Sequence, residues 1–189
     1  MPFSSFADEH RLILRVVNAF ERYLHDFPVD TPESRQDLQR FVVFFREYAD
    51  LIHHEKEETI LLPAMVHAGC DWEGADLKHV REDHQQERYL MRSLRQIAAQ
   101  RGLWSGEDLR HLNAVGQELI DFLRAHMERE TVLLYPAART HITGEHEVKL
   151  KQALDDYARV RGDRDAWLVE LGEELIRDHP LPTRPPAPH

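Results

Sequence analysis

The chain is short of several features that mark common classes of protein. Among its 189 residues it has a single cysteine, Cys70, so no disulfide can form within the chain, and we expect a reducing, cytoplasmic setting. No apolar run approaches the ~20 residues that cross a bilayer. The N-terminus lacks the basic and apolar regions of a secretory signal. These absences argue against a secreted or membrane-spanning protein.

Basic residues are also too few for a surface that binds nucleic acid. The chain has 24 Lys and Arg against 34 Asp and Glu, a net charge of −10, and no dense Lys/Arg block. Phosphate backbones and anionic lipid headgroups both require a concentrated positive surface. We therefore expect neither nucleic acid nor a membrane as a partner, and the sequence indicates no protein partner.

Sustained period-two alternation is missing too, whereas helical periodicity runs through nearly the whole chain. Residues such as Ser5, Thr31 and Ser105 are good N-caps, and Gly69 and Gly102 are good helix terminators. Four long helices joined by short connections are typical of an all-α, antiparallel up-down-up-down four-helix bundle. The predicted helices cover about residues 5–28, 31–66, 75–101 and 105–140, with a turn at 68–74.

The C-terminal part of the chain is predicted to be separate from this bundle. Residues 1–140 form the bundle, and residues 141–178 form a helical extension of one or two shorter helices divided near Gly162. We expect this extension to pack across one side or end of the bundle. Residues 179–189 are rich in proline and are expected to be a disordered tail.

An internal repeat contains the informative residues. Residues 53–64 align with 126–137, and six of the twelve positions are identical. The residues before His10 also resemble those before His84, at almost the same offset, so the two halves of the bundle look like copies. The identical pairs are His53/His126, Glu55/Glu128, Glu57/Glu130, Leu61/Leu134, Pro63/Pro136 and Ala64/Ala137.

Histidines and glutamates interrupt the apolar stripes of these helices. Steps of three or four residues along the second predicted helix pass Phe45, Ala49, His53, Glu57 and Ile60, and the fourth helix has the same interruption. A buried ionised carboxylate costs several kcal/mol, and no Lys or Arg lies on the same stripes to compensate it. A divalent or trivalent metal ion supplies the missing positive charge.

The number of candidate ligands suits two ions. A His and a Glu four residues apart on a helix can serve one metal centre, because their Cβ atoms are about 5–6 Å apart. Two such pairs, with one His from each remaining helix, give four imidazoles and two carboxylates. This set suits two metals bridged by the carboxylates, with coordination positions left open. The candidate ligands are His10, His53, Glu57, His84, His126 and Glu130.

Each of these residue types also has an ordinary structural role. A lone His on an apolar stripe is usually a hydrogen-bonded core residue, and a single His/Glu pair usually lies on a surface, so it is the duplication that favours metal binding. His54 should point about 100° away from His53, and we expect it beside the ligands or on the surface instead of holding the metal. Tyr135 is expected to pack as an ordinary aromatic residue, although it could reach the rim of the site. Glu58 and Glu87 are expected to be solvated charges, although Glu87 lies one turn from His84 and could hydrogen-bond near the metal.

The run His-His-Glu-Lys-Glu-Glu-Thr-Ile-Leu-Leu-Pro at 53–63 resembles the signature of the hemerythrin-like family, the HHE cation-binding domains. The resemblance spans about residues 5–140 and implies a four-helix bundle around a non-haem di-iron centre. It implies that the six residues above are the iron ligands, with Glu57 and Glu130 as the bridging carboxylates.

One feature departs from the oxygen-carrying hemerythrins, whose third helix supplies two histidines four residues apart. Here Val80 and Arg88 lie four residues before and after His84. The resemblance then implies two histidines on each iron and an extra open position. This arrangement is more similar to bacterial members linked to oxygen, peroxide or nitric oxide chemistry than to a simple oxygen carrier.

We therefore expect a cytoplasmic di-iron protein that binds dioxygen, peroxide or nitric oxide, in oxidative-stress response or sensing. Two other interpretations stay open at this point: a di-iron enzyme with catalase-like or peroxidase-like activity, and an iron store. A structural zinc site is a further alternative, since zinc accepts the same side chains.

Overall fold

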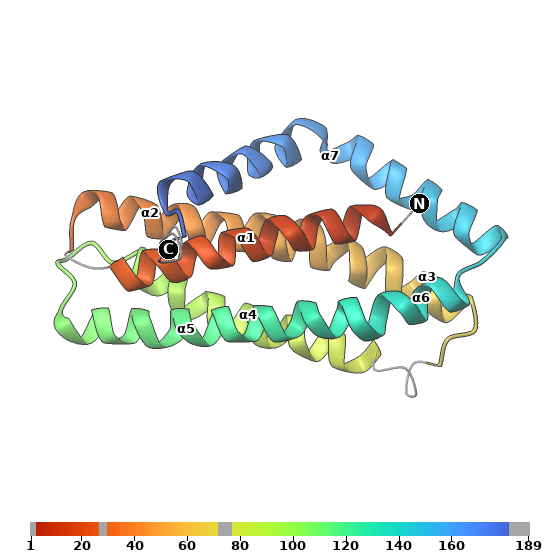
Figure 1. Ribbon diagram of the computed structural model, residues 1–189, viewed down its shortest axis with the longest axis horizontal. Helices are drawn as coiled ribbons and strands as arrows, with labels where there is room; N and C mark the ends of the chain where they lie inside the picture. Colours follow the sequence, from red (N-terminus) through yellow and green to blue (C-terminus); the bar gives the residue numbers. More distant parts are fainter. Residues whose placement is uncertain (1–2, 27–29, 72–76, 182–189) are drawn as a thin grey trace, which may run out of the picture.

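A computed structural model describes residues 3–26, 30–71 and 77–181 of the chain. All regular structure in these ranges is helical, as the sequence predicts (Figure 1). The predicted helix end near Pro28, part of the turn at 68–74 and the tail from residue 182 onward lie outside the described residues. The elements are α1 (Ser4–Asp26), α2 (Pro32–Phe44), the π-helical η1 (Phe45–His54) and η2 (Glu57–Leu61), α3 (Leu62–His67), α4 (Leu77–Ala98), α5 (Gly106–Arg129), the π-helical η3 (Glu130–Leu134), α6 (Tyr135–His141) and α7 (Glu145–Asp178).

The helices begin where their capping residues predict. The Thr31 side chain accepts a hydrogen bond from the Ser34 amide, and Pro32 occupies the first helical position of α2. Ser105 and Asp108 form a capping box, in which each side chain accepts a hydrogen bond from the backbone of the other. Helix α4 ends at Ala98, three residues before the predicted end at Arg101.

The helical run from Pro32 to His67 is continuous but contains π-helical turns. Both η2 and η3 directly precede a turn that contains a proline, Pro63 in one case and Pro136 in the other. Proline has no N–H to donate and its ring meets the carbonyl group four residues earlier, which favours a wider preceding turn. Segments η2 and η3 begin at the repeat-related residues Glu57 and Glu130, so the two halves of the repeat share this backbone conformation as well as their sequence.

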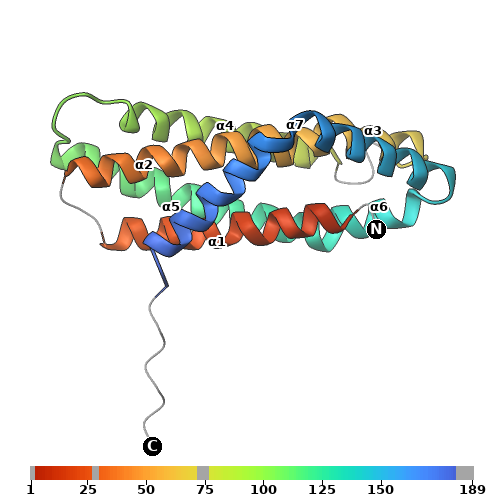
Figure 2. The same cartoon turned by 90° about the horizontal axis from the view of Figure 1, so that it is seen from above.

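The interior contains two apolar clusters separated by a polar layer. Helix α1 packs on α5, α5 on α4, and α4 on α2, and the views in Figures 1 and 2 agree with these contacts. The larger apolar cluster includes Phe20, Phe41 and Phe45, and the smaller one includes Phe6 and Leu61. We call the buried side chains between the clusters the polar layer; it consists of His10, His53, His54, Glu57, His84, Glu87, His126 and Glu130.

The extension after residue 141 consists of two helical segments that share the label α7 and meet at a kink at Gly162, where the sequence predicts a division. Gly162 has a φ of +26°, which an L side chain rarely adopts and which is not helical, so the chain changes direction there. Helix α7 crosses α1 and α2 obliquely (Figure 2). A Cβ atom at Gly172 would lie 2.6 Å from Cε2 of Phe44, so glycine permits this close approach. The ion pair of Arg15 with Glu173 holds the outer edge of the contact.

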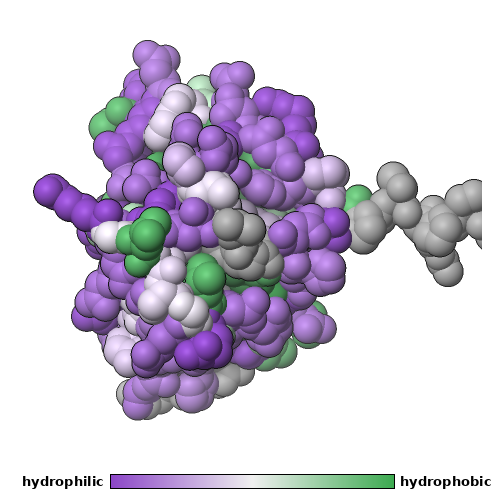
Figure 3. All heavy atoms as spheres, turned by 90° about the vertical axis from the view of Figure 1, so that its left-hand side faces the viewer, coloured by the Kyte–Doolittle hydropathy of each residue, from purple (hydrophilic) through white to green (hydrophobic). Residues whose placement is uncertain are grey.

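Large apolar side chains on the surface are scattered instead of forming a belt. Leu103, Val160 and Tyr89 are examples that lie on different elements. The end of the molecule where α2 and α5 begin is mostly hydrophilic, with isolated apolar side chains (Figure 3). Within the described residues, no helix has both the length and the apolar character that a membrane crossing requires.

Candidate metal centre

The structure brings all six predicted site residues together in the polar layer. His10 on α1, His84 on α4 and His126 on α5 meet the His–Glu pair of the second helical run and Glu130 of η3. Their exposed fractions are at most 5%. The two glutamates therefore face the interior, as the apolar stripes predict.

The six side chains form two groups that share both carboxylates. His10 and His53 lie with Glu57 and Glu130, and one ligand atom from each falls within 4.8 Å of the others. His84 and His126 form a second group of the same size with the same two glutamates. Each glutamate thus belongs to both groups, which is the arrangement expected of a carboxylate that bridges two ions.

The orientation of the carboxylates agrees with bridging. Oε1 of Glu57 lies 3.8 Å from Nε2 of His53, whereas its Oε2 lies 3.4 Å from Nε2 of His84. Each carboxylate therefore directs one oxygen toward each group. The corresponding distances for Glu130 are 3.1 Å from Oε2 to His10 Nε2 and 3.2 Å from Oε1 to His126 Nε2.

Each of the four predicted histidines has a partner at its other ring nitrogen. In metal sites such partners fix the ring orientation and the tautomer of the ligand. The partners are related by the internal repeat, because Glu9 corresponds to Asp83 and Glu58 to Thr131. The distances from Nδ1 are 2.9 Å for His53 to Glu9, 3.3 Å for His126 to Asp83, 2.8 Å for His84 to Glu58 and 3.4 Å for His10 to Thr131.

The basic residues nearest the layer pair with these outer carboxylates and not with the bridging ones. Lys56 is buried and pairs with Glu9, and Arg129 pairs with Asp83 at the repeat-related position. Among the described residues, no ion pair joins Lys or Arg to Glu57 or Glu130, and the charge that compensates these carboxylates comes from imidazoles or from a bound cation.

Without a bound cation, protons on the imidazoles compensate the carboxylates. Burial would raise the pKa of Glu130, but attraction to His126 and close contacts with His10 and His84 outweigh it and hold this pKa well below its usual range. Burial would likewise lower the pKa of His84, but close contacts with Glu130 and Glu57 hold this pKa well above its usual range. Metal ions compete with protons for the same ligand atoms, so a cation can replace these protons.

Several inward-facing atoms of the layer have no hydrogen-bond partner. They include Oε2 of Glu57, both oxygens of Glu130, and Nε2 of His84 and His126. Buried polar atoms are paired in the great majority of cases, so a cluster of unpaired ones requires an explanation. All of these atoms belong to side chains that ligate metals, and the set fits a pair of bound ions.

His54 lies beside the predicted ligands, which is one of the two positions expected for it, and not on the surface. It is fully buried, and its ring stacks on that of His84 with centroids 4.0 Å apart. With His84 and His126 it forms a third group of ligand atoms within 4.8 Å. A rotation of 100° from His53 brings this residue toward α4 and not toward solvent, because the interior face of the helix is wider than a single row of residues.

Glu87 is buried as well, which corrects its predicted role as a solvated charge. Its Oε2 lies 3.0 Å from Nδ1 of His54, and burial raises the pKa of Glu87 to about 8. Glu58 is half-buried and contacts both His84 and Arg88, so it is not a freely solvated charge either.

Tyr135 contributes a polar group to the layer in addition to its aromatic packing. Its hydroxyl donates a hydrogen bond to Oε1 of Glu57 at 2.6 Å and lies 2.9 Å from Nε2 of His10. This hydroxyl therefore lies beside the group that contains His10 and His53, and the apolar pattern of the sequence did not predict it.

The comparisons with known proteins agree with this geometry. A family model described as the hemerythrin HHE cation binding domain matches residues 1–138. Comparisons with curated proteins and with solved structures each found no match. The matched range includes all six candidate ligands and ends before α7.

Proposed function

The chain belongs to the hemerythrin HHE cation-binding family, and on this basis we propose that it is a non-haem di-iron protein that binds a small oxidant. The oxidant is dioxygen, peroxide or nitric oxide. The observation that carries the proposal is the pair of buried glutamates, each of which directs its two oxygens toward two different groups of histidines. Imidazole and carboxylate ligands together suit iron.

In this proposal the two ions have different ligands. His10 and His53 would hold one ion and His84 and His126 the other, with Glu57 and Glu130 shared between them. His54 would add a third imidazole to the second ion, since one of its ring nitrogens lies within 4.8 Å of a ring nitrogen of His84 and of His126. Fewer imidazoles would then hold the first ion, and the oxidant would bind at that ion, beside the Tyr135 hydroxyl.

The protein's own groups prepare this position. Glu9 and Asp83 hold the rings of His53 and His126 by their Nδ1 atoms, and this contact fixes which nitrogen faces the centre. The Tyr135 hydroxyl holds a proton next to Glu57, and the two apolar clusters exclude bulk water from the layer. Iron, when bound, supplies Lewis acidity and electron transfer toward the oxidant.

The proposal includes the cell compartment and the chain topology. We place the protein in the cytoplasm, and we assign to residues 1–140 the antiparallel up-down-up-down connectivity of a four-helix bundle. Residues 141–178 are its helical extension. The single free cysteine, Cys70, supports a reducing compartment.

Elemental analysis of anaerobically purified protein, followed by optical spectra, tests the proposal. We expect two irons per chain and a spectral change on addition of dioxygen or nitric oxide. Sustained loss of added peroxide would instead assign a catalase-like or peroxidase-like enzyme. Zinc in place of iron, or no bound metal, would contradict the di-iron assignment.

A further inference from the structure

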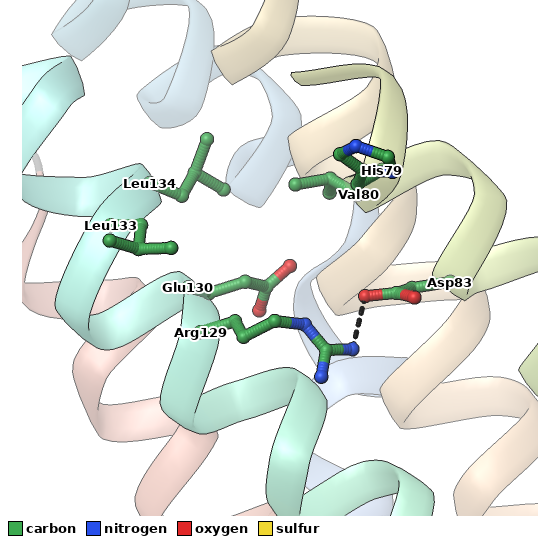
Figure 4. A pocket seen from close by; sticks show the side chains of 7 residues that line it. All are labelled: His79, Val80, Asp83, Arg129, Glu130, Leu133 and Leu134. Atoms are coloured by element: carbon green, nitrogen blue, oxygen red, sulfur yellow. Dashed lines mark hydrogen bonds and ion pairs between the residues drawn. The ribbon is translucent and has the colours of Figure 1, made fainter. Parts of the chain in front are cut away.

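A pocket of about 340 Å³ lies between α4 and the junction of α5 with η3 (Figure 4). Val80 of α4 and Leu133 and Leu134 of η3 form apolar parts of its wall. Glu130 also lines it, and the close-up shows its carboxylate between the two helices. The pocket therefore connects the surface with one of the two candidate bridging carboxylates.

The buried end of the pocket is the Glu130 carboxylate, whose ion-pair partners are histidines. Glu130 is 1% exposed, and neither of its oxygens has a hydrogen-bond partner. A liquid water occupies about 30 Å³, so the pocket volume is that of roughly eleven waters. A divalent cation with a shell of about six waters fits this space and can exchange waters for protein oxygens at Glu130.

The outer end of the pocket has further side chains that bind cations. His79 and Asp83 line it, and Asp83 also lies 3.3 Å from Nδ1 of His126. Arg129 closes on Asp83 with an ion pair of 2.5 Å, drawn as a dashed line in Figure 4. The Arg129 side chain is 46% exposed, so it can rotate into solvent and leave the Asp83 carboxylate to an entering cation.

The first half of the repeat has a pocket at the corresponding place, lined by Ser5, Glu9 and Lys56, but none of the six candidate ligands lines it. Phe6 stands where the second half has Val80. The Phe6 ring is fully buried, with its centroid 5.7 Å from that of Tyr135 and 5.2 Å from Nζ of Lys56. A large ring therefore occupies the first half at the place where the smaller valine lines the pocket in the second half, and only the second-half pocket of this pair reaches a bridging glutamate.

We propose that this pocket is the path by which divalent metal ions enter and leave the centre. The proposal rests on the proposed function, because it needs a metal centre at Glu130. Apolar walls keep the ion hydrated until it reaches the carboxylate, while Asp83 and His79 attract it at the mouth. The net charge of −10 favours the approach of cations in general, and this pocket is lined by a candidate ligand, Glu130.

The repeat itself provides the test variant. Val80→Phe places in the second half the ring that stands at the same repeat position in the first half, Phe6. A plug in the path raises the barrier for entry and exit equally, so it changes both rates and leaves the affinity unchanged. We expect uptake of Fe²⁺ by the metal-free protein, and its release to a chromogenic chelator, to slow at least about tenfold, with two ions bound at the end.

Val132→Phe is the matched control, because Val132 lies in the same π-helical turn as Leu133 but is 61% exposed and does not line the pocket. It should load and release Fe²⁺ at the parent rate. Anaerobic stopped-flow absorbance measures both rates, and circular dichroism reports whether each variant folds. If Val80→Phe does not fold, Leu133→Phe on the opposite wall replaces it.

The possible results separate this inference from the proposed function. A folded, plugged variant that loads at the parent rate would overturn the entry path while leaving a di-metal centre in place. If Val80→Phe left metal uptake unchanged but slowed the binding of azide to the loaded protein, the pocket would be the path of the oxidant. This result would also overturn the inference that metal ions enter through it. A parent protein that takes up no Fe²⁺ would refute the proposed function itself.

Discussion

In the first half of the repeat Glu9 holds the ring of His53, and in the second half Asp83 holds the ring of His126. The same correspondence relates the basic partners Lys56 and Arg129, which pair with these two carboxylates. The two halves therefore share not only the candidate ligands but also the groups that orient them. A shared outer layer of this kind is expected where both halves hold the same kind of ligand.

Three of the differences between the halves give one half a buried polar group that the other half lacks. His54 corresponds to Met127, and Glu87, which contacts His54, corresponds to Ile13. The polar pair His54 and Glu87 thus corresponds to the apolar pair Met127 and Ile13. Tyr135 in the second half corresponds to Leu62 in the first.

These differences have an energetic meaning. A buried polar group without full compensation destabilises a fold, whereas Met127 and Ile13 belong to the larger apolar cluster and need none. The polar replacements therefore make the two candidate ion positions unlike each other: one gains an imidazole and the other gains a hydroxyl. The predictions below compare repeat-related residues directly.

The largest effect is expected at the two bridging positions, where the halves should behave alike. Glu57→Ala and Glu130→Ala should each lose most of the bound iron, because each residue belongs to both ligand groups. Bound iron at a free concentration 100 times its Kd stabilises the folded protein by about 3 kcal/mol. Variants that no longer bind iron lose this stabilisation, so their melting temperature in the presence of iron should fall as well. His53→Ala should behave in the same way.

Elemental analysis and thermal unfolding with and without iron measure both effects. Glu128→Ala is the control, because Glu128 is exposed and lies only two residues before Glu130. Full iron content in either glutamate variant would show that the two halves do not share their carboxylates.

The next effect concerns the hydroxyl that only the second half has. Tyr135→Phe removes a buried hydrogen bond to Glu57 and should lower the free energy of unfolding by about 1.5–3 kcal/mol. Leu62→Met at the corresponding position conserves volume and should have a smaller effect. Chemical denaturation of the metal-free proteins measures the difference, and equal effects would mean that the hydroxyl contributes nothing.

A third prediction makes the halves alike. The double variant His54→Met, Glu87→Ile copies the apolar pair of the other half and should stabilise the metal-free protein by about 1–2 kcal/mol. The same change should weaken the binding of one of the two ions, since it removes an imidazole beside His84 and His126. Urea unfolding and iron titration measure the two effects. A less stable metal-free double variant would contradict the energetic account of the polar pair.

The smallest expected effect is a difference in pH dependence between the N-terminal caps of α2 and α5. Asp108 in the cap of α5 accepts hydrogen bonds from the Ser105 side chain, from Gln100 and from the Ser105 backbone, which lower its pKa to about 2. A carboxylate with a lowered pKa in the folded state stabilises the fold above its unfolded pKa of 3.8 and ceases to do so as the pH falls through 2.

The neutral Thr31 hydroxyl that caps α2 does not titrate in this way. In an NMR titration the Ser105 amide should therefore shift with a midpoint near 2, whereas the Ser34 amide, which Thr31 caps, should show no transition of that origin. A Ser105 midpoint near the ordinary carboxyl value would contradict the capping contact.

Much of this architecture could be predicted from the sequence because the repeat marks it twice. The duplicated His–Glu pairs predicted which side chains meet, and Thr31 and Ser105 predicted where two helices begin. His54 escaped this reasoning because a stripe drawn through one residue per turn is narrower than the interior face of a helix with several neighbours. The signal in the sequence was the apolar Met127 at the corresponding position, which is buried in the structure.

Other features depend on contacts that no local pattern records. The burial of Glu87 follows from its contact with His54 on a different helix, and the Tyr135 hydroxyl reaches a carboxylate 78 residues away in the chain. The π-helical turns had a sequence signal in Pro63 and Pro136, whose missing amide protons disturb the preceding turn. The course of α7 depends on tertiary contacts such as that of Gly172 with Phe44.

Titration of the metal-free chain with Fe²⁺ under native mass spectrometry tests the central claim most directly, because it counts the ions bound to each molecule. The account predicts a final mass that corresponds to two irons per chain, and neither ion retained when both Glu57 and Glu130 are replaced by alanine. A parent chain that binds no iron, or a double variant that still binds two, would contradict the claim that the polar layer is a carboxylate-bridged metal centre.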